Sequence, residues 1–238
     1  MQKQENTDYK KLIAFWDSAF SAKKEQKLMA DETDSSEALK AMAPSEKLFT
    51  AAHSLGEKRR VLDYGCGSGW AGIIAAKGGC KEVLCVDAAK NAVDMTARNA
   101  ERFAVSTDVN TLHIAEDWLS QQPAGSFDGF FCSNVLDVVP PKMSEEIITQ
   151  AARITNAEAS IIIGLNYYLR PDAERNAALE CRNGNQYYVD GILRLVSRTD
   201  EDWAALFEKY FTVDRLEHFA WPGEEKETRR LFYLSKNH

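Results

Sequence analysis

The sequence predicts an α/β fold built on a doubly wound, mostly parallel sheet with helices on both faces. Strand-like and helix-like segments alternate five times between residues 58 and 169, as they do in parallel sheets with crossover helices. The stretch "ASIIIGLNYYL" is almost continuously apolar, which suits a strand buried on both faces. Two strand-like segments joined by the polar turn "PGEEKE" end the chain, so we expect the last strand to run antiparallel to the others.

Glycines and apolar periodicity mark the first half of this alternation. "RRVLDYG" is a short apolar strand, and the small-residue helix "SGWAGIIAAKGG" that follows it is stopped by Gly78 and Gly79. "EVLCVDA" is the second strand. The segment "KNAVDMTARNAERFA" predicts a helix because its apolar residues fall on one face. "TLHIAEDW" then predicts the third strand.

The second half continues the pattern and ends in the hairpin. "SFDGFFCSNVLDVV" contains the fourth strand, and the helix "PPKMSEEIITQAARIT" has a proline in its first turn, where the missing N–H is harmless. "DEDWAALFEKYF" is the last helix before the two hairpin strands. Residues 166–200 lie between the fifth strand and this helix as an insertion of roughly 35 residues, a length that is usually functional or disordered.

The chain is divided into a helical N-terminal part and the alternating part. Residues 1–56 are predicted to form a helical cap or lid, and residues 57–238 the main domain. Tyr9, Ile13, Trp16 and Phe20 recur at helical spacing and form an aromatic stripe in an otherwise charged segment. This stripe either folds over a ligand as a lid or packs the helix on the domain, and both readings stay open.

Composition excludes several classes of partner. The net charge of −7, with no clustered run of Lys and Arg, argues against a nucleic-acid partner. No run of about 18 apolar residues is present, so we expect no membrane span. The polar N-terminus lacks the apolar core of a signal peptide, so we expect a cytoplasmic protein. The five cysteines form no C-x-x-C pair, and neither they nor the four histidines have the spacing of a metal site.

The stretch "VLDYGCGSGW" is the strongest motif. Gly65, Gly67 and Gly69 follow a strand and precede a helix, where bare backbone lets a ligand approach closely. Trp70 stands where the dinucleotide fingerprint requires its third glycine, which argues against a nicotinamide cofactor. Acids end three consecutive strands, at Asp63, at Asp87, and at Glu116 with Asp117. This pattern predicts a cleft for a nucleoside that carries positive charge and no pyrophosphate.

At these residues the sequence resembles the class I S-adenosylmethionine-dependent methyltransferases. "VLDYGCGSGWAGIIAA", Asp87, "AEDW" and "FDGFFCSNVLDVVP" carry the resemblance over residues 58 to about 165, and the terminal hairpin extends it. The resemblance implies seven strands in the order 3-2-1-4-5-7-6, S-adenosylmethionine as cofactor, S-adenosylhomocysteine as product, and the insertion 166–200 over the acceptor site.

The resemblance also assigns the cofactor-binding residues. It implies that the glycine loop, with Cys66, lies against the methionine and ribose parts of the cofactor, and that the region of Asp63 engages the amino-acid end. Asp87, next to Ala88, would accept from the ribose hydroxyls. Asp117, or Glu116 in its place, would accept from the adenine amino group, with Trp118 on the ring. The segment 132–136, including Ser133 and Asn134, would line the cleft near the sulfonium. Independently of the resemblance, Trp16 of the aromatic stripe is a further candidate contact to the cofactor if the N-terminal helix folds over it.

No catalytic residue is assigned, because methyl transfer from a sulfonium needs mainly alignment and exclusion of water. Candidates for a general base or an acceptor contact are His218, Tyr167 and Tyr188. Asp137 stands where many family members carry a histidine, and "SNVL" differs from the Asn/Asp-Pro-Pro-aromatic motif of base-methylating enzymes. We therefore expect no methylation of nucleic-acid bases. We also expect that the methyl acceptor is a small organic molecule, that no metal is bound, and that the protein is a monomer or a homodimer. An NAD-dependent oxidoreductase and a cofactor-binding protein without turnover remain as alternatives.

Overall fold

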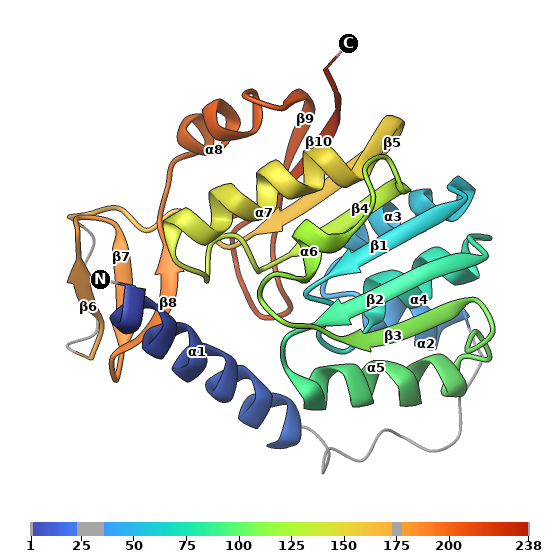
Figure 1. The fold of residues 1–238 in the computed structure, drawn as a ribbon, viewed down its shortest axis with the longest axis horizontal. Coiled ribbons are helices and arrows are strands. Elements are labelled where there is room, and N and C mark those ends of the chain that lie inside the picture. The colour runs from blue at the N-terminus through green and yellow to red at the C-terminus, as the bar shows by residue number, and fades with distance from the viewer. Residues whose placement is uncertain (1, 23–35, 173–177, 238) are drawn as a thin grey trace.

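The computed structural model describes residues 2–22, 36–172 and 178–237, and its centre is a seven-stranded sheet (Figure 1). The strand order is β3-β2-β1-β4-β5-β10-β9. The first five of these strands pair in parallel, and β10 runs antiparallel to both of its neighbours. The strands, in sheet order, are Val109–His113, Glu82–Asp87, Arg60–Tyr64, Phe127–Ser133, Thr155–Leu165, Arg229–Lys236 and Phe211–Phe219. Without the short strands of the insertion, this is the predicted order 3-2-1-4-5-7-6.

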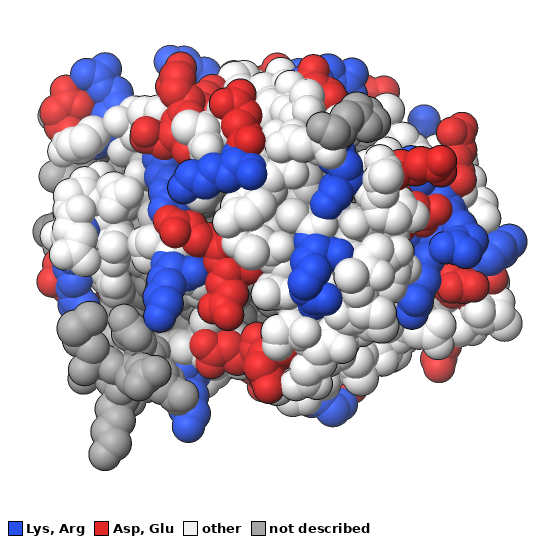
Figure 2. Space-filling model, turned by 45° about the horizontal axis from the view of Figure 1, so that its top comes forward, with Lys and Arg blue, Asp and Glu red and all other residues white. Residues whose placement is uncertain are grey.

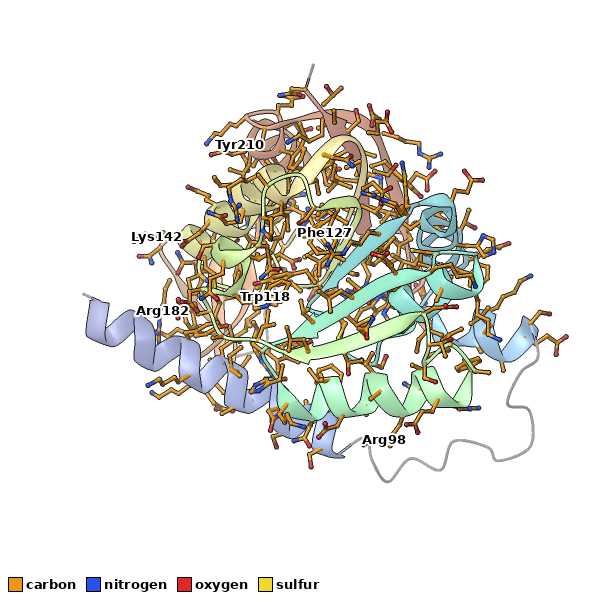
Figure 3. All side chains as sticks on the ribbon, turned by 45° about the vertical axis from the view of Figure 1, so that its right-hand side comes forward. Arg98, Trp118, Phe127, Lys142, Arg182 and Tyr210 are labelled. Atoms are coloured by element: carbon orange, nitrogen blue, oxygen red, sulfur yellow. The ribbon has the colours of Figure 1, made fainter. Side chains whose placement is uncertain are left out.

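Helices cover both faces of the sheet, as predicted. On one face lie α3 (Glu46–Ser54), α4 (Trp70–Lys77) and α5 (Lys90–Arg102). On the other face lie α6 (Trp118–Gln121), α7 (Pro141–Ile154) and α8 (Asp200–Phe207). Figure 3 shows Arg98 on the outer side of α5, as the amphipathic pattern of this helix requires, whereas Phe127 of β4 is buried.

Side chains along the central strands point alternately into two separate hydrophobic cores, one on each face of the sheet. Ile161 and Ile163 of β5 belong to the core under α7, whereas Ile162 between them belongs to the core under α3 and α4. Phe130 and Phe131 of β4 divide in the same way. Side chains of a strand point alternately to its two faces, so a strand covered on both sides must be apolar throughout. This explains the continuous apolar run that the sequence shows.

Two predicted boundaries differ from the structure. The third strand was expected at residues 111–118 but is β3, Val109–His113, so the acids after it lie outside the sheet. The helix expected at residues 200–211 ends at Phe207, and Phe211 begins β9. The start of this helix is fixed by Thr199, whose side chain accepts from the backbone of Asp202 in a reciprocal capping box.

The insertion forms a small sheet of its own. Its antiparallel strands are β6 (Glu180–Arg182), β7 (Gln186–Val189) and β8 (Ile192–Val196). The backbone N–H of Val196 donates to the carbonyl of Asp137 at 2.6 Å, which joins this sheet to the loop after β4. The insertion therefore packs beside the carboxyl edge of the main sheet.

Helix α1 (Gln2–Ala22) lies across this edge of the molecule, between α5 and the insertion (Figure 1). Asp17 accepts from the backbone N–H of Asn91, at the start of α5, at 2.7 Å and from the Asn91 side chain at 2.8 Å. On the other side, the Arg194 guanidinium lies 3.6 Å from the Phe15 ring centroid. The helix α2 (Ser36–Met42) leads from the N-terminal part into α3. No helix in the described ranges is long and apolar enough to cross a bilayer.

Candidate functional site

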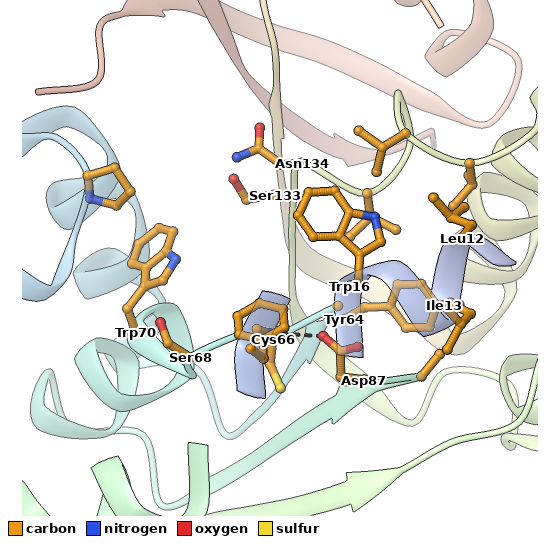
Figure 4. Close-up of a pocket in the computed structure, with 18 of the residues that line it drawn as sticks. Leu12, Ile13, Trp16, Tyr64, Cys66, Ser68, Trp70, Asp87, Ser133 and Asn134 are labelled. Carbon is orange, nitrogen blue, oxygen red and sulfur yellow. Dashed lines mark hydrogen bonds between the residues drawn. The ribbon is translucent and has the colours of Figure 1, made fainter. Parts of the chain in front are cut away.

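A cavity of about 510 Å³ opens at the carboxyl ends of the parallel strands (Figure 4). Tyr64, Asp87 and Ser133 line it from the ends of β1, β2 and β4. Ligands of open α/β sheets bind at this edge, outside the carboxyl ends of the strands. Helix α1 closes one side with Tyr9, Leu12, Ile13, Trp16 and Phe20. The aromatic stripe thus faces the cavity, and in Figure 4 Trp16 points into it from above Asp87.

The glycine loop requires a backbone that other residues adopt with difficulty. Gly65 and Gly69 have φ of +72° and +78°. A Cβ at Gly65 would come within 2.2 Å of Val135, and one at Gly69 within 2.4 Å of Thr96. Gly69 also begins α4 as its N-cap. The three glycines therefore let β1 turn sharply into α4 while bare backbone faces the cavity.

Asp87 holds this loop and still faces the cavity. Its Oδ2 accepts from the backbone N–H of Gly67 at 3.0 Å (Figure 4), and its Oδ1 accepts from Ala89 at 2.8 Å. Burial raises the pKa of Asp87, and the backbone donors oppose this rise. A carboxylate offers about four acceptor positions, so Asp87 keeps acceptor capacity for a ligand beside these backbone donors. Neighbouring Ala88 also lines the cavity.

Asp63 lies behind the loop rather than in the cavity. Its side chain is buried, and its Oδ2 accepts from the backbone N–H of Gly72 in α4 at 3.0 Å. Burial raises its pKa to about 7. The carboxylate thereby ties β1 to the first turn of α4. Asp63 is not among the residues that line the cavity, and its carboxylate stabilises the glycine loop; the contact predicted between the Asp63 region and the cofactor stays a prediction.

The acids after β3 are placed differently from the prediction. Asp117 is exposed at the start of α6, where its carboxylate accepts from Gln121 at 2.9 Å. Trp118 packs against the core under α7, and neither residue lines the cavity. The cause is that β3 ends early, at His113, so that Ile114 rather than Asp117 or Trp118 lines the cavity. Glu116, the alternative to Asp117, lines an adjoining hollow beneath α1 together with Tyr9 and Ala88.

The turn after β4 reaches the cavity as expected. Ser133, Asn134 and Val135 line it, whereas Cys132 and Leu136 on either side are buried in the core. Asn134 has a φ of +55°, a left-handed backbone that asparagine tolerates better than most residues. Its Oδ1 is buried and has no hydrogen-bond partner among the described residues. Cys66, Gly65 and Gly67 line the cavity on the opposite side, and Gly69 supports them.

The three catalytic candidates lie away from the cavity. His218 on β9 pairs through Nε2 with Asp200 at 2.9 Å, at the start of α8. Tyr167 is 39% exposed after β5. Tyr188 belongs to β7, donates to Gln186 and carries Arg182 over its ring at 4.2 Å. None of the described residues of the insertion lines the cavity; the insertion packs against α1 and Asp137, and its place over the acceptor stays a prediction.

Several lining residues were not predicted from the sequence. They come from the start of α7 and the loop before it, from the segment before α3, and from the turn between β9 and β10: Val138, Val139, Met143, Ile147, Ala41, Met42, Ala43, Pro44, Trp221 and Pro222. The topology offered one signal, because an antiparallel hairpin returns its turn to the carboxyl edge of the parallel strands. An aromatic residue in the turn after β9, such as Trp221, was therefore a candidate for the wall of the cavity.

The part of the cavity wall that the structure describes carries little charge. Among the lining residues in the described ranges Asp87 alone has a charged side chain, and aromatic and aliphatic groups predominate. Burial raises the pKa of Tyr9 to about 12 and raises the pKa of Tyr64 as well. Both phenols therefore keep their protons at neutral pH and can donate hydrogen bonds. In the described ranges no group of His, Cys, Asp and Glu is placed to hold a metal ion.

Comparisons with known proteins agree with this geometry. Residues 61–158 match the family model described as a methyltransferase domain. The ribosomal protein L11 methyltransferase of Ralstonia pickettii is 33% identical over 147 residues, which cover 62% of this chain and 42% of that protein. The ribosomal RNA large subunit methyltransferase I of Aeromonas hydrophila is 35% identical over 100 residues, 40% of this chain and 23% of that protein. The chain thus spans less than half the length of these relatives.

The fold extends the similarity over nearly the whole chain. The crystal structure of the 1,6-didemethyltoxoflavin-N1-methyltransferase of Burkholderia thailandensis, with bound 1,6-didemethyltoxoflavin and S-adenosylhomocysteine, matches with a TM-score of 0.67 at 16% identity. The match covers 94% of this chain and 88% of that one. The glycine loop, the strand order and the family match agree. The chain is therefore similar to methyltransferase domains over residues 61–158 and shares its fold with a methyltransferase of known structure over nearly its whole length.

Proposed function

We propose that this protein binds S-adenosylmethionine in the 510 Å³ cavity and transfers its methyl group to a small, uncharged organic acceptor. One observation carries the proposal: Asp87 holds the glycine loop through Gly67, still presents unused acceptor positions to the cavity, and has the one charged side chain among the described lining residues. A carboxylate at the end of the second strand is placed to accept from ribose hydroxyls.

The residues present fit this cofactor. Cβ-free backbone at Gly65 and Gly67 lets a ligand approach the loop closely, and Asp87 offers the acceptor for a sugar. The rings of Trp16 and Tyr64 present π-faces, which favour a cation such as a sulfonium. When bound, S-adenosylmethionine supplies a methyl group on positively charged sulfur, which a nucleophile displaces directly. The protein has to align the acceptor and exclude water, and good alignment contributes roughly 7–11 kcal/mol.

The surface charge of the protein and the shape of the cavity favour a small acceptor over a ribosomal protein or ribosomal RNA, which the names of the relatives mention. A nucleic acid is held mainly by clustered Lys and Arg. On the face shown in Figure 2, basic and acidic side chains are interspersed. Helix α1 also lies over the cavity, with Phe20 close to Gly67. A cavity closed by a helix suits a small molecule better than a protein side chain on a large carrier.

Calorimetric titration with S-adenosylhomocysteine tests cofactor binding. We expect micromolar affinity for the wild type and no binding of NADH. Asp87→Ala should weaken binding by about 10- to 100-fold, because ribose hydroxyls and the Gly67 N–H lose their acceptor. Asp87→Asn keeps an acceptor oxygen and should weaken it less. Asp94→Asn, at an exposed acid of α5 that pairs with Lys90, is the matched control and should bind normally.

Methyl transfer from radiolabelled S-adenosylmethionine tests the acceptor class. We expect label in uncharged small heterocycles and none in unmodified ribosomal particles or ribosomal RNA. Binding of NADH in place of S-adenosylhomocysteine would overturn the cofactor assignment. Label in ribosomal protein or RNA at comparable rates would overturn the small acceptor.

A further inference from the structure

The hydrophobic residues of the cavity wall belong to two different cores. Tyr64 and Ile147 pack on the core under α7, and so do Leu12 and Trp16 of α1. A second set packs on the core under α3 and α4: Met42, Ala43, Cys66, Trp70 and Trp221. The two cores lie on opposite faces of the sheet, so the cavity reaches around the carboxyl edge from one face to the other.

The tryptophans of the second set lie away from Asp87. Figure 4 shows Trp70 and Asp87 on opposite sides of Cys66. The Trp70 ring meets Phe131 of β4 edge-on, with the ring centroids 5.3 Å apart. Strand β4 is two strands, or about 10 Å, from the strand β2 that carries Asp87. Trp221 is farther along the sheet, because it follows β9 in the turn to β10, beyond β5.

Both tryptophans keep part of their surface accessible. Trp70 and Trp221 are only partly buried, and both line the cavity. Trp203, in contrast, is completely buried in the core under α7 and lines no part of the cavity. Packing in a core therefore accounts for Trp203 but not for the whole of the other two rings. We call the part of the cavity bordered by Met42, Ala43, Trp70 and Trp221 the tryptophan end.

A pair of charged side chains fixes the turn that carries Trp221. The Arg229 guanidinium lies 3.7 Å from the centroid of the indole and donates to both carboxylate oxygens of Glu224. The Glu224 carboxylate also accepts from the backbone N–H of Trp221 at 2.8 Å. The Arg229 side chain is only 7% exposed, and Glu224 neutralises its charge. Arg229 thus orients the indole and offers no free cation to a ligand.

Lys47 ties the same turn to α3. Its Nζ donates to the carbonyl of His218 at 2.6 Å and pairs with Glu227 at 2.7 Å. Helix α3 begins just after the segment 41–44, which lines the cavity as well. The two walls of the tryptophan end are therefore held to each other, and this end of the cavity has a fixed shape.

The tryptophan end suits a flat, uncharged ring. Indole, thioether and aliphatic groups form its walls, and none of the described residues that border it carries a charge. A charged ligand group would lose its hydration there and gain no partner. Aromatic walls favour a flat aromatic ring over a saturated ring of the same size, and the sulfur of Met42 adds a favourable contact to such a ring.

We infer that the tryptophan end holds a flat, uncharged aromatic ring of the methyl acceptor, and that Trp70 and Trp221 select this ring. Arg229 is a positioning residue, because it acts through its contact with the Trp221 indole. The inference rests on the proposed function, since it assigns the acceptor's part of the cavity beside the part that Asp87 serves. It narrows the acceptor from a small organic molecule to an aromatic one.

Fluorine NMR of the full chain labelled with 5-fluorotryptophan locates a bound ring directly, because the chain has five tryptophans. Replacing each tryptophan in turn by phenylalanine assigns the resonances. The wild type is saturated with S-adenosylhomocysteine, and 2-naphthol, an uncharged flat bicycle, is added up to about 1 mM. We expect 2-naphthol to shift the resonances of Trp70 and Trp221. The resonances of Trp118 and Trp203, which line no part of the cavity, should stay unchanged.

Two matched probes test the chemistry of the ring. 2-Decalol keeps the carbon skeleton and the hydroxyl but is saturated, and 2-naphthoate is flat but carries a charge. We expect 2-decalol to bind about 3- to 10-fold more weakly than 2-naphthol, the factor that aromatic contacts contribute beyond buried area. 2-Naphthoate should bind at least about 10-fold more weakly, because its charge finds no partner.

Variants at Trp221 test its part in the selection. Trp221→Ala removes the ring and should weaken 2-naphthol binding about 10-fold. Trp221→Phe keeps an aromatic ring and should weaken it by no more than about threefold. Both variants should leave the affinity for S-adenosylhomocysteine within about twofold of the wild type, because Trp221 lies away from Asp87.

Arg229→Met tests the positioning role. It should shift or broaden the Trp221 resonance before any ligand is added, and weaken 2-naphthol binding about 2- to 5-fold. Glu224→Gln loosens the hold on Arg229, keeps an acceptor for the Trp221 N–H, and should act in the same direction. Arg215→Met is the matched control, because Arg215 covers the Tyr233 ring at 3.9 Å outside the cavity. It should change neither the Trp221 resonance nor the affinity for either ligand.

The outcomes separate the two proposals. If S-adenosylhomocysteine binds and 2-naphthol either does not bind or shifts neither Trp70 nor Trp221, the inference is wrong and the proposed function stands. The same holds if 2-decalol or 2-naphthoate binds as tightly as 2-naphthol. Equal affinities of Trp221→Ala and the wild type for 2-naphthol would refute the selection by Trp221. If S-adenosylhomocysteine itself does not bind, the proposed function fails, and the inference fails with it.

Discussion

Two aspartates at neighbouring strand ends perform different tasks because their surroundings differ. Asp63 is enclosed between β1 and α4 and meets the Gly72 N–H and the Cys85 thiol. Asp87 borders the cavity and keeps acceptor positions open. The sequence predicted both as ligand contacts, since both end parallel strands. Which side of the strand end each carboxylate faces depends on the packing of α4, and the motif alone does not reveal it.

Burial of Asp63 predicts a specific pH dependence of stability. Its pKa is raised from 3.8 to about 7 in the folded state, so the native protein retains this proton in a range where the unfolded chain has lost it. The native state then binds more protons, and stability falls as pH rises from about 4 to 7. The rise in pKa corresponds to roughly 4 kcal/mol.

Asp63→Asn removes this dependence and keeps an oxygen for the Gly72 N–H. Urea unfolding at pH 4.5 and pH 8 should show the variant gaining a few kcal/mol relative to the wild type as pH rises. All other titrating groups are common to both proteins and cancel in the difference. Parallel pH profiles of the two proteins would contradict the assignment.

Helix α1 connects the cavity to two parts of the molecule far apart in the sequence. Asp17 accepts from the backbone N–H of Asn91 near the start of α5, where the helix dipole favours a negative charge. Phe15 contacts Arg194 of the insertion. Between these contacts, Trp16 lines the cavity. The sequence predicted the stripe and left open whether it covers a ligand or the domain, and the structure shows the stripe at the cavity.

Docking of α1 should contribute to ligand affinity. Asp17→Ala removes both hydrogen bonds from Asn91 to the Asp17 carboxylate, and a charge-assisted hydrogen bond contributes roughly 1.5–3 kcal/mol. We expect about 10-fold weaker binding of S-adenosylhomocysteine, and a smaller difference from the wild type at high salt, because salt screens a partly exposed charge. Ser18→Ala, at the exposed neighbouring position of the same helix, is the control. Equal affinities for Asp17→Ala and Ser18→Ala would show that α1 does not close over the ligand.

At the scale of the whole molecule, a buried group of charges joins the sheet to the insertion and α8. Arg230 on β10 is 1% exposed; it donates to the Arg198 carbonyl at 2.9 Å and pairs with Asp200 at 3.4 Å. Asp137 accepts from the backbone N–H of Asn166 at 2.6 Å. Burial raises the pKa of Asp137, and the nearby Arg230 charge opposes this rise. Breaking such a group leaves an uncompensated buried charge.

Arg230→Met should therefore lower the free energy of unfolding by about 3–5 kcal/mol. Asp137→Asn should lower the free energy of unfolding less in the Arg230→Met background than in the wild type, because the Arg230 charge near the carboxylate is already absent there. Urea denaturation of the wild type, the two single variants and the double variant gives this double-mutant cycle. Arg215→Met, at an exposed arginine of β9, is the control and should change stability little. Additive effects of the two substitutions would contradict the coupling.

Features that depend on interactions between residues close in the sequence were predicted correctly, whereas features that depend on long-range packing were not. The strand order was expected from the resemblance to a known family. The two-faced sheet was predictable from the residues themselves, because apolar periodicity and glycine turns are local, and β5 shows it best, with Ile161 and Ile162 in opposite cores. The cavity walls at Trp221 and Val138 were not, because they depend on which loops meet above the sheet. The pairing of His218 with Asp200 was not predicted for the same reason, because it depends on where α8 packs against the sheet.

The central claim is that a positively charged thioether nucleoside binds beside the glycine loop with its sugar on Asp87. A crystal structure of the protein soaked with S-adenosylhomocysteine tests it most directly. The account predicts both ribose hydroxyls within hydrogen-bond distance of the Asp87 carboxylate, with the sulfur between the glycine loop and Asn134. Density for the nucleoside outside this cavity, or an Asp87 carboxylate turned away from the sugar, would contradict the account.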